Sequence, residues 1–67
     1  MVKIVLNGAL REVAANLSVG ELLDAVGYAQ RKVAVEVNRE IVPKSQHAQR
    51  ILSEGDRIEI VHAMGGG

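Results

Sequence analysis

Hydrophobic and polar residues alternate near the start of the chain, and this period of two predicts a β-hairpin. Residues 2–6 alternate in this way and end at Asn7-Gly8, a dipeptide typical of a two-residue hairpin turn. Residues 10–13 mix apolar and charged side chains, as outer strands do when charges protect a free edge. We therefore expect two antiparallel strands in the N-terminal part of the chain.

A capping motif follows this hairpin and predicts a short helix. Ser18 is followed three residues later by Glu21, the spacing of a capping box, and Gly27 is suited to ending the helix in a left-handed conformation. The apolar residues between these signals share one helical face: Leu22, Leu23 and Val26. A helix of about two to three turns needs a sheet to pack on, because isolated helices of this length are marginal in water.

The middle of the chain predicts a second hairpin. Residues 33–37 are β-branched and alternating, and Asn38-Arg39 makes a tight connection to a short return at residues 40–42. Pro43 then ends the pairing, because it cannot donate a backbone hydrogen bond.

An irregular segment and a final strand complete the pattern. Residues 44–52 predict a helical turn within a loop, and their apolar cluster is expected to close one end of the core: Ala48, Ile51 and Leu52. After a turn at residues 53–56, residues 57–62 alternate cleanly as a strand that leads directly into the terminal glycines.

The predicted order of elements, ββαββ followed by a last strand, favours an α+β fold with a mixed sheet of four to five strands covered on one face by one helix. Residues 14–32 are long enough for a crossover that lets the last strand run parallel to the first. This arrangement is the β-grasp. We expect one domain at residues 1–63 and a flexible glycine tail at residues 64–67.

The alternation also assigns the two faces of the sheet. The face toward the helix is expected to carry Val2, Ile4, Leu6, Ile58 and Ile60. The opposite face is expected to carry Lys3, Val5, Glu59, Val61 and Ala63. Its apolar members Val5, Val61 and Ala63 predict a docking face for a partner beside the tail, although single exposed valines are common on protein surfaces.

Composition narrows the classes of function. The chain has 67 residues, 48% of them hydrophobic but only one aromatic, so its core is aliphatic. The absence of cysteine excludes disulfides and thiol chemistry and is typical of a reducing compartment. Eight basic residues balance eight acidic ones, and without aromatic stacking platforms no nucleic-acid partner is expected. No apolar run matches a membrane span or a signal peptide, so we expect a cytoplasmic protein without a membrane partner.

Side chains suited to catalysis are few. His47 and His62 stand far apart in sequence and in no motif, so a structural or surface role is expected for each. A metal site would need further ligands, which neither Asp56 nor Glu59 supplies at a recognisable spacing, and no metal is predicted. Ser45 has no neighbouring base in the sequence. We therefore predict that the protein is not an enzyme and has no catalytic residue.

The most informative stretch for function is the C-terminal one: Met64, Gly65, Gly66 and Gly67. Glycine has no side chain to pack and loses the most backbone entropy on ordering, so this tail is suited to leaving the domain. Extended, it reaches roughly 13 Å at about 3.3 Å per residue, which would place Gly67 in the active site of a partner. A free carboxylate on Gly67 would be ionised and open to an electrophile. The alternative is a frayed terminus without a role.

The strands, the helix start and the tail also form a series of recognisable motifs. They are KIVLNG (3–8), SVGELL (18–23), VAVEVN (33–38), IVPKSQHA (41–48), EGDRIEIV (54–61) and the terminal Gly66-Gly67. Together they resemble the ThiS family, the ubiquitin-like β-grasp sulfur carriers of thiamine biosynthesis, over essentially the whole chain. A third glycine, Gly65, departs from the terminal pair of the family and lengthens the tail.

The resemblance implies a cycle of activation and sulfur transfer at Gly67. An E1-like adenylating enzyme would use ATP and Mg²⁺ to form an acyl-adenylate there, and a sulfur donor such as a cysteine desulfurase would supply the sulfur that displaces AMP. The resulting thiocarboxylate would deliver sulfur to thiazole synthase for the thiazole ring of thiamine. The chain itself would bind no cofactor, and Gly66 and Gly67 would enter the active sites of the partners.

Two alternatives stay open at this point. The Gly-Gly end is shared with ubiquitin-like proteins and with the small subunit of molybdopterin synthase, so the sulfur could instead serve molybdopterin or tRNA thiolation. A β-grasp interaction module with an incidental tail is a different class of function. It would bind its partners equally well when the chain ends at Ala63.

Overall fold

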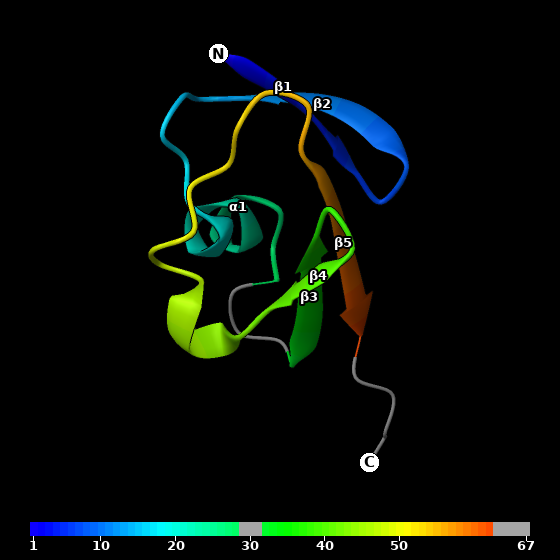
Figure 1. Cartoon of the computed structure of the whole chain (residues 1–67), viewed down its shortest axis with the longest axis vertical. Helices are drawn as coiled ribbons and strands as arrows, with labels where there is room; N and C mark the ends of the chain where they lie inside the picture. The colour runs from blue at the N-terminus through cyan, green and yellow to red at the C-terminus, as the bar shows by residue number, and fades with distance from the viewer. Residues whose placement is uncertain (29–31, 63–67) are drawn as a thin grey trace.

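The computed structural model describes residues 1–28 and 32–62 of the chain. Its elements are β1 (Val2–Leu6), β2 (Ala9–Val13), α1 (Val19–Ala25), β3 (Val33–Val37), β4 (Glu40–Val42), the 3₁₀ turn η1 (Lys44–Gln46) and β5 (Arg57–His62). Figure 1 shows α1 lying against one side of the twisted sheet, with the N-terminus and the end of β5 at opposite ends of the molecule.

The strands form one sheet in the order β2-β1-β5-β3-β4. β5 runs parallel to β1 and antiparallel to β3, while both hairpins are antiparallel. The last strand of the sequence therefore occupies the centre of the sheet, because the crossover through α1 brings it between the two hairpins. The predicted α+β class and the β-grasp topology are confirmed in the described residues, and the sheet has five strands.

The helix begins and ends where its capping signals predict. The Ser18 hydroxyl oxygen accepts a hydrogen bond from the Glu21 amide at 3.0 Å, and the Glu21 carboxylate accepts one from the Ser18 amide at 3.0 Å. At the other end Gly27 adopts a φ of +89°, and the Tyr28 amide donates to the Leu23 carbonyl at 2.8 Å. These bonds satisfy backbone groups that a free helix end leaves unpaired.

The core lies between α1 and the face of the sheet that the alternation assigns to the interior. Ile4 is fully buried and Ile58 is 1% exposed, and both belong to one aliphatic cluster with Leu22 of the helix. The buried set is Ile4, Leu6, Val13, Val19, Leu22, Leu23, Val35, Val37, Val42, Leu52, Ile58 and Ile60, with Val2 partly buried against it. The predicted inward face is thus confirmed.

The segment between β4 and β5 differs from its prediction. Of the three apolar residues expected to close the core, only Leu52 is buried, whereas Ala48 and Ile51 are exposed. Ile51 makes an isolated antiparallel bridge to Ser18, and the Leu52 amide donates to the Leu17 carbonyl at 2.8 Å. In this extended backbone successive side chains point to opposite sides, so Leu52 turns inward and Ile51 outward.

Candidate functional site

The predicted tail continues from the strand at the centre of the sheet. β5 ends at His62, and Ala63 and the tail residues Met64, Gly65, Gly66 and Gly67 lie outside the described residues. The boundary between the domain at 1–63 and the tail at 64–67 therefore stays a prediction. The structure does describe the strand that leads into the tail, together with the groups that hold this strand.

Asn7 supports β5 beyond the last residue of β1. Its backbone amide donates to the Ile58 carbonyl at 2.9 Å, and its side-chain oxygen accepts a hydrogen bond from the Ile60 amide at 2.8 Å. The side chain thus extends the contact of β5 past the end of the parallel ladder. From the sequence we assigned Asn7 only to the hairpin turn, and this second role depends on a pairing between residues 53 positions apart.

The two described members of the predicted docking face lie on the same open side of the sheet. Val5 is half-buried and pairs in register with Arg57, whereas Val61 is 52% exposed and lies opposite Ala34. Charged residues of β5 separate the two valines, so they belong to two apolar spots on one face. The prediction of a docking contact at Val5, Val61 and Ala63 stays a prediction.

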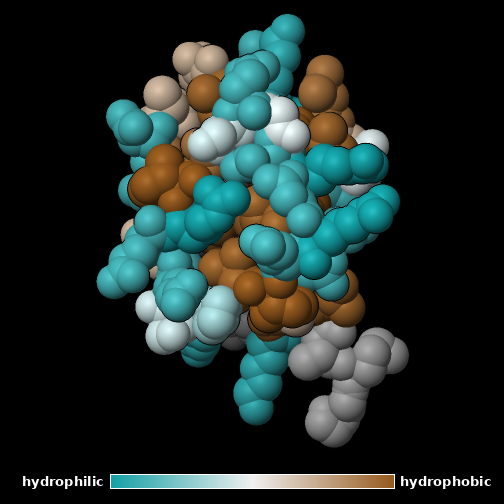
Figure 2. Space-filling view, viewed as in Figure 1, coloured by the Kyte–Doolittle hydropathy of each residue, from teal (hydrophilic) through white to brown (hydrophobic). Residues whose placement is uncertain are grey.

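Two further apolar residues on this face were missed by the sequence analysis. Leu10 is 71% exposed and lies opposite Val5, and Ile41 is 61% exposed and lies opposite Glu36. The length of the two hairpin turns fixes these pairings, so counting outward from each turn would have found both residues. Figure 2 shows, for the side of the molecule in view, apolar side chains interleaved with hydrophilic ones.

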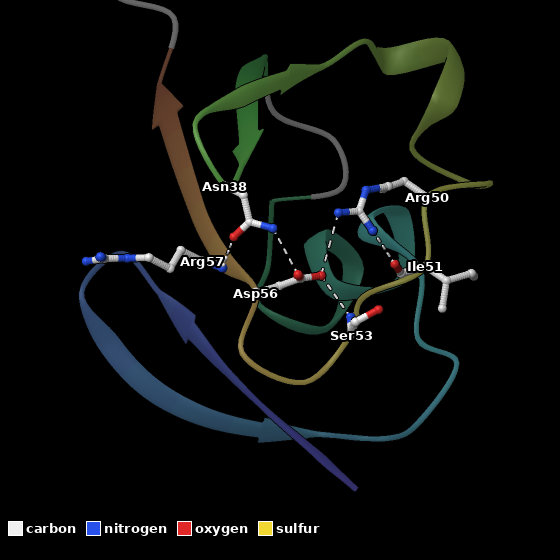
Figure 3. Close-up of polar contacts among 6 residues, drawn as sticks. All are labelled: Asn38, Arg50, Ile51, Ser53, Asp56 and Arg57. Atoms are coloured by element: carbon white, nitrogen blue, oxygen red, sulfur yellow. Dashed lines mark hydrogen bonds and ion pairs between the residues drawn. The ribbon is translucent and has the colours of Figure 1, made fainter.

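A polar network joins the β3–β4 turn to the start of β5 (Figure 3). Asp56 is 7% exposed, and its carboxylate accepts hydrogen bonds from the Ser53 amide at 2.8 Å and the Asn38 side-chain amide at 3.0 Å. Arg50 lies 3.7 Å from the same carboxylate. Asn38 in turn accepts a hydrogen bond from the Arg57 amide at 3.0 Å. The network fixes the turn against β5 in one position.

A surface hollow of about 190 Å³ lies beside this network, lined by Arg39, Arg57 and Glu59. It offers two guanidinium groups and one carboxylate, a set suited to binding charged groups rather than to nucleophilic catalysis. Among the described residues no group of three or more histidine, cysteine or acidic residues could hold a metal ion.

His47 and Ser45, the remaining candidates for catalysis that the structure describes, lie in places that favour a structural or surface role. The His47 Nε2 atom lies 3.0 Å from the Val42 carbonyl oxygen, and the His47 carbonyl accepts a hydrogen bond from the Gly20 amide at 2.9 Å. His47 thus ties the start of α1 to the end of β4. Ser45 is exposed in η1, and no described helix is long and apolar enough to cross a membrane.

Comparison with known proteins adds an independent observation. A family model described as the ThiS family matches residues 4–67. The sulfur carrier protein ThiS of Escherichia coli is 35% identical over 65 residues, with 97% of this chain and 98% of that protein covered. A crystal structure of the thiamine biosynthesis protein ThiS from Geobacter metallireducens matches with a TM-score of 0.86 and 35% identity, covering 98% of this chain and 100% of that one.

One further relative is a much longer protein than this chain. A thiazole synthase of Paramagnetospirillum magneticum is 51% identical over 65 residues, which cover 97% of this chain. The chain spans only 20% of the length of that relative.

Proposed function

The chain belongs to the ThiS family, and we propose that it is a sulfur carrier of thiamine biosynthesis, a protein co-substrate rather than an enzyme. The observation that carries this proposal is the match over nearly the full length of both chains to a protein named sulfur carrier protein ThiS. The terminal Gly66-Gly67 supplies the group on which such a carrier would act. The structural match to a thiamine biosynthesis protein supports the thiamine pathway over molybdopterin or tRNA thiolation.

The proposed chemistry takes place at the carboxyl group of Gly67. In the first step this carboxylate attacks the α-phosphorus of ATP on an E1-like adenylating enzyme, with Mg²⁺, and forms an acyl-adenylate while pyrophosphate leaves. In the second step a sulfide equivalent attacks the carbonyl carbon, the bond to AMP breaks, and a thiocarboxylate remains. Adenylation is needed because AMP is a far better leaving group than oxide. The glycines allow a narrow active site to close around the backbone.

The fold contributes a rigid base for this tail. β5 pairs with β1 and β3, and Asn7 holds it at Ile60, so the last described strand is supported on both sides. We propose that Val5, Val61 and Ala63 dock against a partner while residues 64–67 enter its active site. In this proposal no side chain of the carrier takes part in catalysis, because the partner enzyme supplies the catalytic groups.

Thiazole synthase is the proposed acceptor of the sulfur. The relative named thiazole synthase includes, within a longer chain, a segment 51% identical to this protein. A carrier-like segment in the same polypeptide as a thiazole synthase supports a functional link between the two. The E1-like enzyme, a sulfur donor such as a cysteine desulfurase, the use of ATP and Mg²⁺ by the partner, and a cytoplasmic location are parts of the proposal that rest on the family resemblance.

Intact-mass spectrometry tests the carrier function directly. The protein is incubated with its adenylating enzyme, ATP, Mg²⁺ and sulfide, and replacement of one oxygen by sulfur is expected to add about 16 Da. Deletion of Gly67, or the substitution Gly66→Leu, is expected to abolish the mass increase while the circular dichroism spectrum stays unchanged. An unchanged mass of the wild-type protein, under conditions that convert the E. coli carrier with its own enzyme, contradicts the proposal.

A truncated chain separates the carrier from an interaction module. A version that ends at Ala63 keeps every described residue but lacks the tail. If it binds the adenylating enzyme as tightly as the full chain, the tail is incidental to partner binding and the interaction-module hypothesis gains support.

A further inference from the structure

The turn between β3 and β4 holds an arginine in a backbone conformation that favours glycine. Val37 pairs with Glu40, so the turn consists of Asn38 and Arg39 alone, with φ angles of +54° and +70°. The equivalent turn between β1 and β2 has Asn7 and Gly8, with φ angles of +50° and +85°. Positive φ at both positions is the conformation for which Asn-Gly is preferred, and a long side chain at the second position is unfavourable.

This comparison within one molecule points to a use for the arginine side chain. The same hairpin geometry is made with glycine in the first turn, yet the second turn carries Arg39 despite the strain. Residues kept in unfavourable backbone conformations often have functional roles, since their side chains are retained at a cost in stability. The question is then what the guanidinium group of Arg39 faces.

Arg39 faces the hollow that it shares with Arg57 and Glu59. The turn that carries it is fixed to β5, because the Asn38 amide donates to the Arg57 carbonyl at 2.8 Å and Asn38 also binds Asp56 (Figure 3). Both arginines are exposed, and neither has an ion-pair partner among the described residues. The hydrogen bonds of the turn therefore fix the backbone of each arginine before a partner binds. The guanidinium groups form no ion pair with a carboxylate of the described residues.

The chemistry of the hollow favours a carboxylate carried by another protein. Two guanidinium groups match the planar, bidentate geometry of a carboxylate. Glu59, which also lines the hollow, repels anions of higher charge, such as free phosphate, more strongly than it repels a single carboxylate. Arg57 also pairs in register with Val5, so the hollow lies on the open face that carries the proposed docking residues Val5 and Val61.

We propose that this hollow binds an acidic side chain of the enzyme that adenylates the tail, and that Arg39 and Arg57 anchor the carrier on that enzyme. The proposal rests on the carrier function proposed above and adds a polar anchor to an otherwise apolar contact. Because Arg57 begins the strand whose end leads into the tail, an anchor at this point also orients the strand toward the active site of the enzyme.

Two substitutions and a matched control test the anchor. Arg57→Gln and Arg39→Gly each remove one guanidinium from the hollow, whereas Arg11→Gln removes the same charge from β2, where residue 11 lies opposite the inward-facing Ile4. Adenylation is measured as pyrophosphate release by the enzyme with the full-length carrier. We expect each hollow variant to raise KM about tenfold, the change that about 1.4 kcal/mol of lost binding produces, with kcat at saturation unchanged.

The dependence of KM on ionic strength and the melting temperature distinguish a binding role of the two arginines from a purely structural one. In both hollow variants KM is expected to depend less steeply on ionic strength than in the wild-type protein, whereas Arg11→Gln keeps the wild-type KM and salt dependence. Arg39→Gly is also expected to raise the melting temperature, because glycine relieves the positive φ. A more stable protein that is a poorer substrate is the signature of a side chain kept for binding.

The results that overturn the proposal are distinct from those that overturn the carrier function. If the wild-type protein gains about 16 Da but either hollow variant keeps the wild-type KM and salt dependence, the carrier function stands and the anchor is wrong. If Arg11→Gln raises KM as much as the hollow variants do, the effect is one of net charge, and the anchor is again wrong. If the wild-type protein is never converted, the carrier function fails and the anchor fails with it.

Discussion

Replacement of Asp56 by alanine is expected to be the most damaging single change to a polar side chain among the described residues. The carboxylate is nearly buried and accepts hydrogen bonds from the Ser53 amide at 2.8 Å and from the Asn38 side chain at 3.0 Å. It also lies 3.7 Å from the guanidinium of Arg50. The substitution removes all three interactions, so the β3–β4 turn is held against the start of β5 only by the two hydrogen bonds between Asn38 and Arg57.

The size of the effect follows from these contacts. A hydrogen bond to a charged group contributes about 1.5 to 3 kcal/mol, and we take the lower end because Ser53 and Asn38 are exposed and their freed donors can bind water. The Arg50 side chain is 37% exposed, so its ion pair adds only about 0.5 kcal/mol. The free energy of unfolding should fall by roughly 3.5 kcal/mol, which lowers the melting temperature of so small a domain by about 14 to 28 °C.

Chemical denaturation followed by circular dichroism measures this change, since the chain has no tryptophan for fluorescence. Asp56→Asn keeps the shape and one acceptor and should lose about half as much stability. Asp24→Ala is the matched control, because Asp24 is an exposed helical residue. A loss below about 1 kcal/mol for Asp56→Ala, or one no larger than that of the control, would refute the reasoning from the network.

Three further predictions concern the helix cap, the support of β5 and the core. Ser18→Ala should lower the free energy of unfolding by about 1 kcal/mol through loss of the capping box, and urea denaturation with Glu21→Gln as a milder comparison would show it. Asn7→Gly keeps the turn but loses the acceptor for the Ile60 amide, so faster hydrogen exchange at Ile60 is expected, and an unchanged exchange rate would contradict the proposed support. Ile4→Val should cost about 1 kcal/mol and Ile4→Ala about 3 to 4 kcal/mol in thermal denaturation, because Ile4 is fully buried; equal losses for the two would argue against a close-packed core.

Local patterns in the sequence predicted most of the fold. Asn7-Gly8 and the alternation on either side of it specify a hairpin, and Ser18 with Glu21 specifies the start of α1. The parallel pairing of β1 with β5 was expected because residues 14–32 are long enough for a crossover. The hairpin turn and the helix cap depend on residues a few positions apart, and the strands on alternating hydropathy. Such local patterns can be read from the sequence.

The features that the sequence did not reveal depend on specific pairs far apart in the chain. Asp56 bonds to Asn38, which lies 18 positions away, and no periodicity indicates that contact. The exposure of Ile51 follows from an isolated bridge to Ser18, and hydropathy alone favoured its burial. The hollow at Arg39 and Arg57 likewise forms only when the second turn is held against β5. For the tail itself, composition and family resemblance remain the whole basis of the prediction.

Intact-mass spectrometry of the protein purified from its native cells tests the central claim most directly. The account predicts a chain that ends at Gly67 and a fraction that is about 16 Da heavier, with the extra mass confined by fragmentation to the terminal glycine. A chain that continues beyond Gly67, or one that stays unmodified in cells with an active adenylating enzyme, would contradict the claim that this carboxyl group carries the sulfur.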